Sequence, residues 1–433
     1  MAGLKAGRSV EVAVTGQLLL ARPLHDSRHG PFLELVERVR NADVAITGFE
    51  GVLAGKGSPS PTATLHVAPR SVAETVAWMG FRLVGLAGNH AFDLGPEGIV
   101  NTIQVFAEHG LATSGTGKDP GETKKAAIFH TTAGRCVALL SRQLGPKAAG
   151  EEAVHARVRD DLPEPLGSRP GVAHIGVERV VSARPDVFAA LAELLEESGY
   201  TALRSERAAM GAEAAAGDGL DAWGTRVVAG NSNSEAWRVD QAGLDDLNQR
   251  VRGISQSGAN AVVHFHNHYW ASNPAAVPGW FRETAASVGA VGAPLVIGHG
   301  YPGLQAFELA QGRLLAHGMG SLAFHTRRPQ RYTGLQVWES VVVLVRLSSG
   351  GVCEKVELLP VVHGDHPGRA RRGSELGEPE LADFETGRAV LERLGARCAS
   401  FGSQVVVRRA GGRAVGELVE GSQSADPDKG SKC

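Results

Sequence analysis

Cysteine is scarce and scattered in this chain. The 433 residues include four cysteines, Cys136, Cys353, Cys398 and Cys433, and none of them has the Cys-x-x-Cys spacing of a zinc knuckle or a redox pair. This usage is typical of proteins from a reducing compartment. We therefore predict a cytoplasmic protein.

Long apolar runs and an excess of one charge are missing as well. No apolar run approaches the roughly 20 residues that cross a bilayer, so we expect no membrane span. The amino terminus leads into a strand-like run, Val10 to Val14, that a glutamate interrupts, which is unlike the apolar core of a signal peptide. The chain has 44 basic and 46 acidic residues, a net charge of −2, and no recurring basic block, so we expect no nucleic-acid partner.

Familiar catalytic signatures are absent too. The chain has no Gly-x-Ser-x-Gly elbow, no phosphate loop ending in Gly-Lys-Ser/Thr, and no Gly-x-Gly-x-x-Gly between a strand and a helix. These absences argue against a serine hydrolase and against a dinucleotide-dependent enzyme.

The chain does contain a regular alternation of short β-rich runs and amphipathic helical patterns. This alternation predicts an α/β layered fold. The predicted strands are Val10–Val14, Val44–Ile46, Leu83–Leu86, Cys136–Leu140, Ala261–Phe265 and Pro294–Ile297, and the predicted helices are Phe32–Arg40, Ser71–Met79, Gly95–His109, Pro185–Ser198, Gly243–Ser257 and Trp280–Val288.

The pattern predicts one large domain over residues 9–330. Its segment 142–182, rich in Gly, Pro, Ala and charged residues, is expected to be an insertion or a flap over the site. A carboxy-terminal extension, 331–411, is expected to pack on the core, and 412–433 is expected to be a disordered tail because the final stretch is polar. The extension is predicted to contain a β-hairpin of Val341–Leu347 and Val352–Leu358, a helix at Leu381–Leu394 and a strand at Gln404–Arg408.

Polar residues follow five of the predicted strands. In α/β folds the loops after the carboxyl ends of the strands build the site, so we expect these strand ends to converge on one edge. The five runs are Gly16-Gln17, Gly48-Phe49-Glu50, Gly88-Asn89-His90, His264 to His268, and Gly298-His299-Gly300.

The run His264-Phe-His266-Asn-His268 is the most informative of the five. Residues i, i+2 and i+4 of a strand share one face, so these imidazoles could converge on one metal or substrate, with His299 as a fourth. A single histidine is more often a satisfied core or surface residue. Hiding several on one face is costly, because each buried ring nitrogen needs a partner, so the cluster predicts a functional site.

The run Gly88-Asn89-His90-Ala-Phe-Asp93 is the most specific short motif. Asn89 offers an amide to a metal or an oxyanion, and His90 can protonate a leaving group if Asp93 orients its other nitrogen. The alternative is the first turn of a helix, with Asn89 as its cap and His90 exposed. Glu50, after a buried-looking strand, could ligate a metal, act as a base whose pKa burial raises, or simply be solvated.

Weaker sequence signals indicate residues that could contact the substrate. Arg169, in an Arg-Pro-Gly turn, could touch a substrate or belong to a plain turn. His317 lies in a glycine-rich turn, where a structural role is slightly favoured because nothing in the sequence pairs it. Gln17 and His268 complete the predicted substrate-binding group.

In this order the motifs resemble the successive blocks of the capsule-synthesis CapA proteins. Those proteins carry the PGA_cap domain, are associated with poly-γ-glutamate capsule production, and belong to the calcineurin-like metallophosphoesterase superfamily. The resemblance covers about residues 9 to 410 and includes Gly318-Met-Gly-Ser-Leu-Ala-Phe324, Trp338-Glu-Ser-Val-Val and Ser400-Phe-Gly-Ser403. It implies a four-layer α/β/β/α sandwich with site residues on the strand-end loops.

The resemblance also implies roles for single residues. By position, Glu50, Asn89, His266 and His299 match ligand or site residues of the family, and His90 matches the histidine at the leaving group or phosphate. Combined with the strand pattern, this predicts His90, His299, Glu50 and Asp93 as catalytic residues and Glu50, Asn89, His264, His266 and His299 as metal ligands.

The chain departs from the family pattern at three places. Gln17 stands where a Gly-Asp motif supplies an aspartate that often bridges two metals, and Ser321 stands where an asparagine is expected. The closing Gly-His-x-His is here Gly298-His299-Gly-Tyr301-Pro302, so a second histidine ligand is lost. A carboxamide supplies no charge, so two adjacent dications would be undercompensated.

The sequence leaves three functions open. A single Zn²⁺ or Mn²⁺ could activate water for attack on an ester or amide of a peptide or poly-γ-glutamate-like substrate. A pocket without metal could move protons at a carbon next to a carbonyl, as peptide epimerases that resemble this fold do. The third is a non-catalytic protein that binds an anionic polymer in capsule synthesis. The oligomeric state is not predicted.

Overall fold

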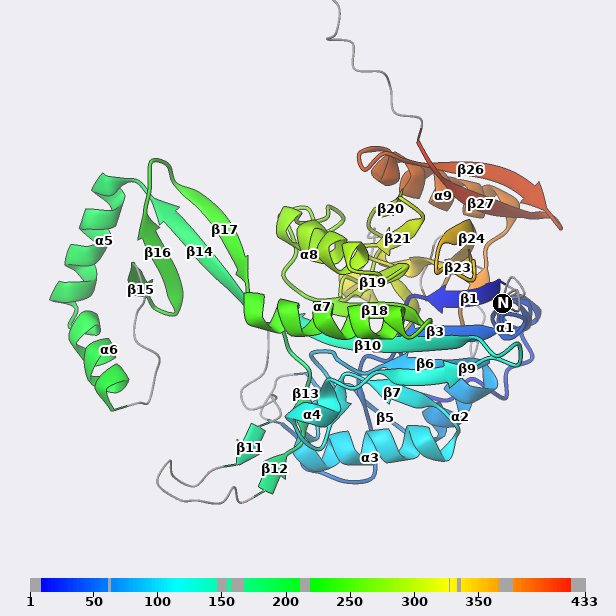
Figure 1. Ribbon diagram of the computed structural model, residues 1–433, viewed down its shortest axis with the longest axis horizontal. Coiled ribbons are helices and arrows are strands. Elements are labelled where there is room, and N and C mark those ends of the chain that lie inside the picture. Colours follow the sequence, from blue (N-terminus) through cyan, green and yellow to red (C-terminus); the bar gives the residue numbers. More distant parts are fainter. Residues whose placement is uncertain are drawn as a thin grey trace, which may run out of the picture. The chain divides into compact units, whose positions relative to one another are not determined.

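The computed structural model describes residues 9–60, 64–145, 154–156, 167–210, 219–326, 328–332, 336–364, 366 and 377–421. They form an α/β fold with two large β-sheets (Figure 1). The chain divides into two compact units. The first runs to Ile175 and resumes at Asp245, and the second is Gly176–Leu244.

The first large sheet has the strand order β26-β27-β24-β23-β1-β3-β6-β7, with β25 paired to β24. Strands β1, β3, β6 and β7 are parallel, and β23 joins β1 in the antiparallel sense. The bounds are β1 (Val10–Thr15), β3 (Val44–Gly48), β6 (Phe81–Gly85), β7 (Ala112–Ser114), β23 (Glu339–Leu347), β24 (Cys353–Val362), β25 (Glu380–Leu381), β26 (Ser403–Ala410) and β27 (Arg413–Glu420).

The second large sheet has the strand order β20-β21-β19-β18-β10-β9. Strands β10, β18, β19 and β21 are parallel, and the two edge strands are antiparallel to their neighbours. The bounds are β9 (Ala127–His130), β10 (Cys136–Gly145), β18 (Asn260–Asn267), β19 (Leu295–His299), β20 (Phe307–Ala310) and β21 (Arg313–Ala316).

Alternation along the strands builds separate cores on the two faces of each sheet. On β1, Val12 and Val14 share a buried core with Val262 and Ile297 of the second sheet, whereas Ala13 belongs to the core under the first group of helices. That group is α1 (Gly30–Arg40), α2 (Ser71–Trp78) and α3 (Gly95–Glu108), and α7 (Gln241–Gln256) and α8 (Gly279–Ala290) lie against the second sheet (Figure 1). The resulting order of helices, sheet, sheet and helices is the four-layer sandwich.

Shorter elements complete the first unit. They are β2 (Gln17–Leu19), β4 (Val52–Leu53), β5 (Val67–Ala68), β8 (Thr116–Gly117), α4 (Pro120–Thr123), β11 (Val154–Ala156), β12 (Gly167–Arg169), β13 (Gly171–Val172), β22 (Ser321–Phe324), two 3₁₀ turns (Pro329–Tyr332 and Gln336–Trp338) and α9 (Phe384–Ala399). None of the helices in the described ranges is both long enough and apolar enough to cross a bilayer.

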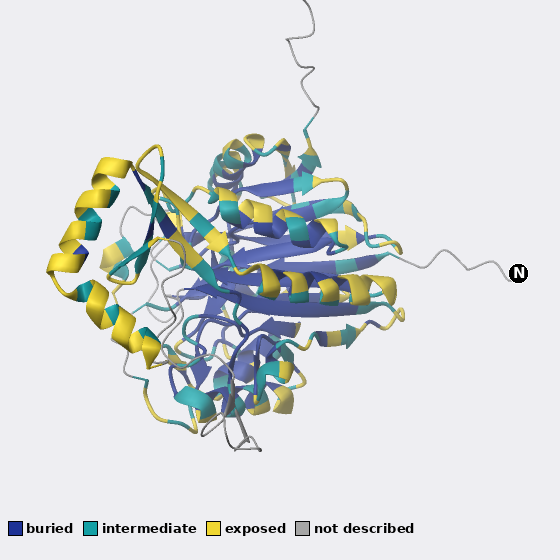
Figure 2. Cartoon of the chain, turned by 60° about the vertical axis from the view of Figure 1, so that its left-hand side comes forward, coloured by how far each residue is buried: buried dark blue, intermediate teal, exposed yellow. Residues whose placement is uncertain are grey.

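The described residues of the second unit form one four-stranded sheet and two helices. The sheet order is β15-β16-β14-β17. The bounds of the strands and helices in this unit are β14 (Val177–Ala183), α5 (Pro185–Glu197), α6 (Tyr200–Ala209), β15 (Leu220–Ala222), β16 (Thr225–Ala229) and β17 (Ser234–Val239). Most residues of α5 and α6 are exposed, in contrast to the buried strands of the two large sheets (Figure 2).

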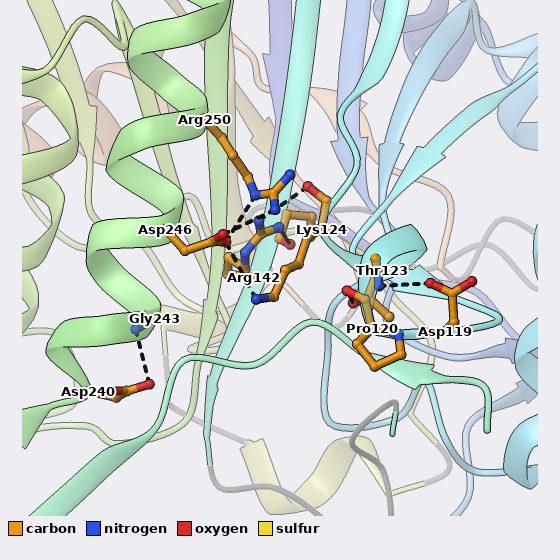
Figure 3. Close-up of polar contacts among 11 residues, drawn as sticks. Asp119, Pro120, Thr123, Lys124, Arg142, Asp240, Gly243, Asp246 and Arg250 are labelled. Carbon is orange, nitrogen blue, oxygen red and sulfur yellow. Dashed lines mark hydrogen bonds and ion pairs between the residues drawn. The ribbon is translucent and has the colours of Figure 1, made fainter. Parts of the chain in front are cut away.

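Charged side chains meet between α7 and the end of β10. Arg250 donates hydrogen bonds of 2.9 and 3.1 Å to Asp246, and Lys124 Nζ lies 3.7 Å from the same carboxylate (Figure 3). The guanidinium of Arg142 is fully buried beside them and donates to the carbonyls of Ser141 and Lys124. Burial lowers the pKa of Arg142 to about 10, so the side chain still carries its charge at neutral pH.

Every predicted strand and helix overlaps an observed one, but the predicted boundaries of the larger segments differ from the structure. The predicted insertion at 142–182 begins inside β10 of the second sheet and ends inside β14 of the second unit. The end of β10 contains Ser141, Arg142 and Gln143, and such a polar composition does not by itself distinguish a strand from a loop.

The carboxy-terminal predictions also need correction. Strand β23 pairs with β1 along its length, so residues of the predicted extension 331–411 complete the first sheet instead of packing on a finished core. The predicted tail at 412–433 was wrong for β27, Arg413–Glu420, which pairs with β26 and buries Ala414, Val415 and Leu418. Residues 422–433 lie outside the described part of the chain.

Candidate functional site

The predicted strand ends meet across the gap between the two facing sheets and not along one edge. Strands β1, β3 and β6 belong to the first sheet, and β18 and β19 belong to the second. A Cβ atom added to Gly48 would overlap the ring of His299, and one added to Gly85 would overlap the ring of His264. Glycine at the ends of β3 and β6 therefore leaves the room in which the histidines of the second sheet fit.

Glu50 lies just after β3 and is buried, with 6% of its surface exposed. Its Oε2 accepts a hydrogen bond of 2.5 Å from Nε2 of Gln17. Burial raises the pKa of Glu50 to about 7, and the charge of Asp93 adds to this, whereas His90 and the Gln17 hydrogen bond act in the opposite direction. Near neutral pH, Glu50 is therefore poised between its acid and carboxylate forms.

Gln17 has both ends of its amide engaged. Its Nε2 donates to Glu50, and its Oε1 accepts a hydrogen bond of 3.0 Å from the backbone N–H of Gly300. The side chain thus joins the end of β1 to the turn after β19. This geometry makes Gln17 a residue that positions Glu50, and its amide oxygen already has a donor.

Glu50, His266 and His268 form the one potential metal-binding group among the described residues, with one ligand atom from each lying within 4.8 Å of the others. His268 Nε2 lies 3.1 Å from His266 Nε2 and 3.9 Å from Glu50 Oε1. Asn89 Oδ1 lies 2.8 Å from His266 Nε2. Burial lowers the pKa of His266 well below its usual range and that of His268 to about 4, so both rings are neutral at pH 7.

This donor set fits a divalent cation. Two neutral imidazoles and one carboxylate make three protein ligands, which is the composition of catalytic zinc sites that keep an open position. A second cation would need more negative charge, and Gln17 supplies none. The residues present therefore fit one metal ion.

His90 and Asp93 form a hydrogen-bonded pair beside this group. His90 Nδ1 lies 2.9 Å from Asp93 Oδ2, and the same oxygen accepts the backbone N–H of His66 at 2.5 Å. Burial disfavours charge on His90, but the Asp93 hydrogen bond and the charges of Glu50 and Asp93 outweigh it and raise the pKa above 6.5. Helix α3 begins only at Gly95, so the alternative in which Asn89 caps a helix is wrong.

His264 and His299 form a second pair, against Gly48 and Gly85 of the first sheet. Their Nε2 and Nδ1 atoms are 2.8 Å apart. His264 Nδ1 lies 2.7 Å from the Ser141 hydroxyl, and His299 Nε2 lies 3.1 Å from the Thr15 carbonyl. The structure therefore separates these two predicted ligands from His266 and adds His268 to the group around Glu50.

Two predicted substrate contacts lie on other elements. Arg169 ends the short strand β12, where it pairs with Val154 of β11. The ring of His317 contacts Phe281 and Phe401, with centroid distances of 6.0 and 5.6 Å, and its Nε2 lies 3.7 Å from Glu308. These contacts point the His317 ring toward helix α8 and give it a packing role.

Sequence reasoning did not select His66 or Ser141. The ring of His66 lies 4.0 Å from that of His90, centroid to centroid, although 24 positions separate them in the sequence. Ser141 sits inside β10 and contacts His264 only because β10 and β18 are neighbours. Neither residue belongs to a motif, so only the packing of the chain reveals them.

Comparisons with known proteins match most of the chain. A family model described as "Bacterial capsule synthesis protein PGA_cap" matches residues 11–326. Two curated relatives from Sinorhizobium fredii (strain NBRC 101917 / NGR234), the uncharacterized proteins y4sH and y4uA, are each 24% identical to the chain over 443 residues. These alignments cover 92% of this chain and 91% of each relative.

Proposed function

The chain belongs to the bacterial capsule synthesis protein PGA_cap family, and we propose that it is a hydrolase that cleaves an ester or amide bond in a peptide-like or poly-γ-glutamate-related substrate. The observation that supports this most strongly is the group of Glu50, His266 and His268, which offers three metal-ligand atoms within 4.8 Å beside the His90–Asp93 pair. The family's role in capsule synthesis supports a polyglutamate-related substrate.

In this proposal Glu50, His266 and His268 hold one Zn²⁺ or Mn²⁺ ion. A divalent cation in such a site supplies Lewis acidity, which activates water and polarises the bond that is cleaved. Gln17 keeps the Glu50 carboxylate in place through its 2.5 Å hydrogen bond. Asn89 Oδ1 lies 2.8 Å from His266 Nε2, the nitrogen that faces His268, and would be a further ligand of the same ion.

His90 serves as the proton donor to the leaving group. The Asp93 carboxylate can only accept when it is ionised, so Nδ1 of His90 carries a proton toward it and Nε2 is left for the substrate. Because the pKa of His90 is raised, a protonated ring is available close to neutral pH.

A second candidate is a peptide epimerase that works without metal. The group has a single carboxylate, Glu50, and Gln17 stands where the family pattern has a second one, so its negative charge is small for the two-metal site of that pattern. Glu50 and His90 would then remove and return a proton at a carbon next to a carbonyl.

Elemental analysis of the full chain, purified without chelator, tests the first proposal together with hydrolysis of L-γ-glutamyl-p-nitroanilide. We expect about one zinc or manganese per chain, and loss of both metal and hydrolysis in the His268→Ala variant. A matched control is His109→Ala, since His109 lies at the end of α3, where its Nδ1 is 2.9 Å from the carbonyl of Val105 in the same helix.

Measurements of metal content, hydrolysis and deuterium exchange on the same purified protein distinguish the other two functions. A metal-free chain that incorporates deuterium from D₂O at a peptide α-carbon would contradict the hydrolase and support the epimerase. A chain without metal, hydrolysis or deuterium exchange would contradict both and leave the binding role in capsule synthesis.

A further inference from the structure

A row of three rings leads from the Glu50 group toward the protein surface. The centroids of His268 and Trp270 are 5.2 Å apart with the rings tilted by 31°, and those of Trp270 and Tyr301 are 5.5 Å apart. We call these three residues the aromatic shelf. Trp270 is 38% exposed, although a large apolar ring is more stable when buried.

The rings of the aromatic shelf are held in place. Trp270 Nε1 donates a hydrogen bond of 3.0 Å to the carbonyl of Asn267, and the Asn267 side chain in turn accepts the backbone N–H of Tyr269 at 2.8 Å. The Tyr301 ring packs on Gly303, where an added Cβ would lie 2.8 Å from the ring. A ligand that packs on these rings therefore meets an ordered surface and loses little conformational entropy in the protein.

The polar edge of Trp270 is already satisfied, so what the ring offers to a ligand is its apolar face. Indole faces bind apolar and aromatic groups, and such pairs contribute about 0.5–1.5 kcal/mol beyond the area they bury. Tyr301 adds to this surface at the position where the family pattern has its second histidine. The chain therefore has an aromatic ring where a metal ligand is expected.

We infer that the aromatic shelf is a substrate subsite that takes an apolar or aromatic side chain next to the bond that is cleaved. This inference rests on the proposed function, because it assumes that the peptide lies against His268 while Glu50 and His266 act on it. The substrate is then a peptide with such a side chain and not a uniform chain of glutamates.

Two dipeptides that share one γ-glutamyl group test the inference by equilibrium binding to the full chain. They are γ-L-glutamyl-L-phenylalanine and γ-L-glutamyl-L-glutamate, and titration calorimetry gives their dissociation constants. We expect the phenylalanine dipeptide to bind about tenfold more tightly, Trp270→Ala to remove this preference, and Trp270→Phe to keep most of it. Trp223→Ala, which removes an exposed tryptophan of the second unit, is the matched control and keeps the preference.

Equal or tighter binding of the glutamate dipeptide to the unchanged chain would overturn the inference, as would a preference that survives in Trp270→Ala. Absence of binding by both dipeptides would also overturn it. The proposed hydrolysis fails separately, because it is measured by metal content and nitroanilide release in His268→Ala, whereas the subsite is measured by affinity.

Discussion

Nε2 of His264 lies 2.8 Å from Nδ1 of His299, and the partners of this contact determine which nitrogens carry hydrogen. The Thr15 carbonyl can only accept, so Nε2 of His299 donates to it. Burial lowers the pKa of His264 well below its usual range and that of His299 to about 4, so both rings are neutral. His299 Nδ1 therefore accepts a hydrogen bond from His264 Nε2. His264 Nδ1 in turn accepts a hydrogen bond from the Ser141 hydroxyl.

Metal binding is expected to depend on His266 and His268 but not on His264. In the described geometry both nitrogens of His264 have protein partners, whereas His268 lies in the group around Glu50. Elemental analysis of the purified variants should show metal in His264→Ala and none in His268→Ala. Loss of metal from His264→Ala, with an unchanged circular dichroism spectrum, would show that the pair rearranges to ligate.

The His264→Ala variant is also expected to be less stable. The change leaves the buried Ser141 hydroxyl and one nitrogen of His299 without their partner, which costs about 1–3 kcal/mol for a buried polar group. Urea unfolding of the metal-free protein measures this difference. A stability equal to that of the unchanged chain would mean that water replaces the lost ring.

Replacement of Asp93 by asparagine is expected to move the basic limb of the kcat/KM profile to lower pH. The Asp93 hydrogen bond raises the pKa of His90 against the effect of burial, so without it His90 loses its proton at a lower pH.

His90→Ala should lower kcat by roughly 100-fold or more, which is the usual size of general acid catalysis. Asp119→Asn, which changes the cap of α4, is the control.

The Gly48→Ala and Gly85→Ala variants are expected to be destabilised, whereas Gly88→Ala is expected to be tolerated. A methyl group at either of the first two positions overlaps a histidine ring, and overpacking of this kind costs roughly 1–3 kcal/mol. At Gly88 the added Cβ would lie 3.5 Å from His266 Nδ1, an ordinary contact. Thermal melts of the three proteins should separate them, and equal melting temperatures would contradict the close approach of the sheets.

The Glu308→Gln variant is expected to lose stability at neutral pH but not in acid. Burial works to raise the pKa of Glu308, but its contacts with His317 and with Arg282, which donates two hydrogen bonds of 2.9 Å, outweigh burial and lower it to about 2. A carboxyl whose pKa is lower in the folded chain stabilises the fold above its unfolded value of 4.5 and loses this effect as the pH falls toward 2.

Urea titrations at several pH values measure this effect as the difference between the unchanged chain and Glu308→Gln. The difference should reach at most about 3 kcal/mol above pH 5 and shrink as the pH falls. A difference that is constant with pH would mean that shape, and not charge, accounts for it.

The sequence by itself determined the elements of the fold. Periods of 2 and 3.6 residues are local properties, so Val10–Thr15, Asn260–Asn267 and Gly95–Glu108 could be predicted from their own residues. It also determined that polar residues follow the strands, which brought Glu50 and His266 into the predicted site. The limits of the second unit, Gly176–Leu244, were missed, because composition does not show where contacts within the chain become sparse.

Only the tertiary structure decided which side chains meet. Glu50 comes from the first sheet and His268 from the loop after a strand of the second, so their 3.9 Å separation depends on how the two sheets pack. The sequence placed His264 and His266 in one ligand set because alternate residues of a strand share a face. The structure divides them between two pairs, His264 with His299 and His266 with His268. Strand register alone would not show this, because the residue opposite His299 in the pairing of β18 with β19 is His266, so the packing of the rings decides which nitrogens meet.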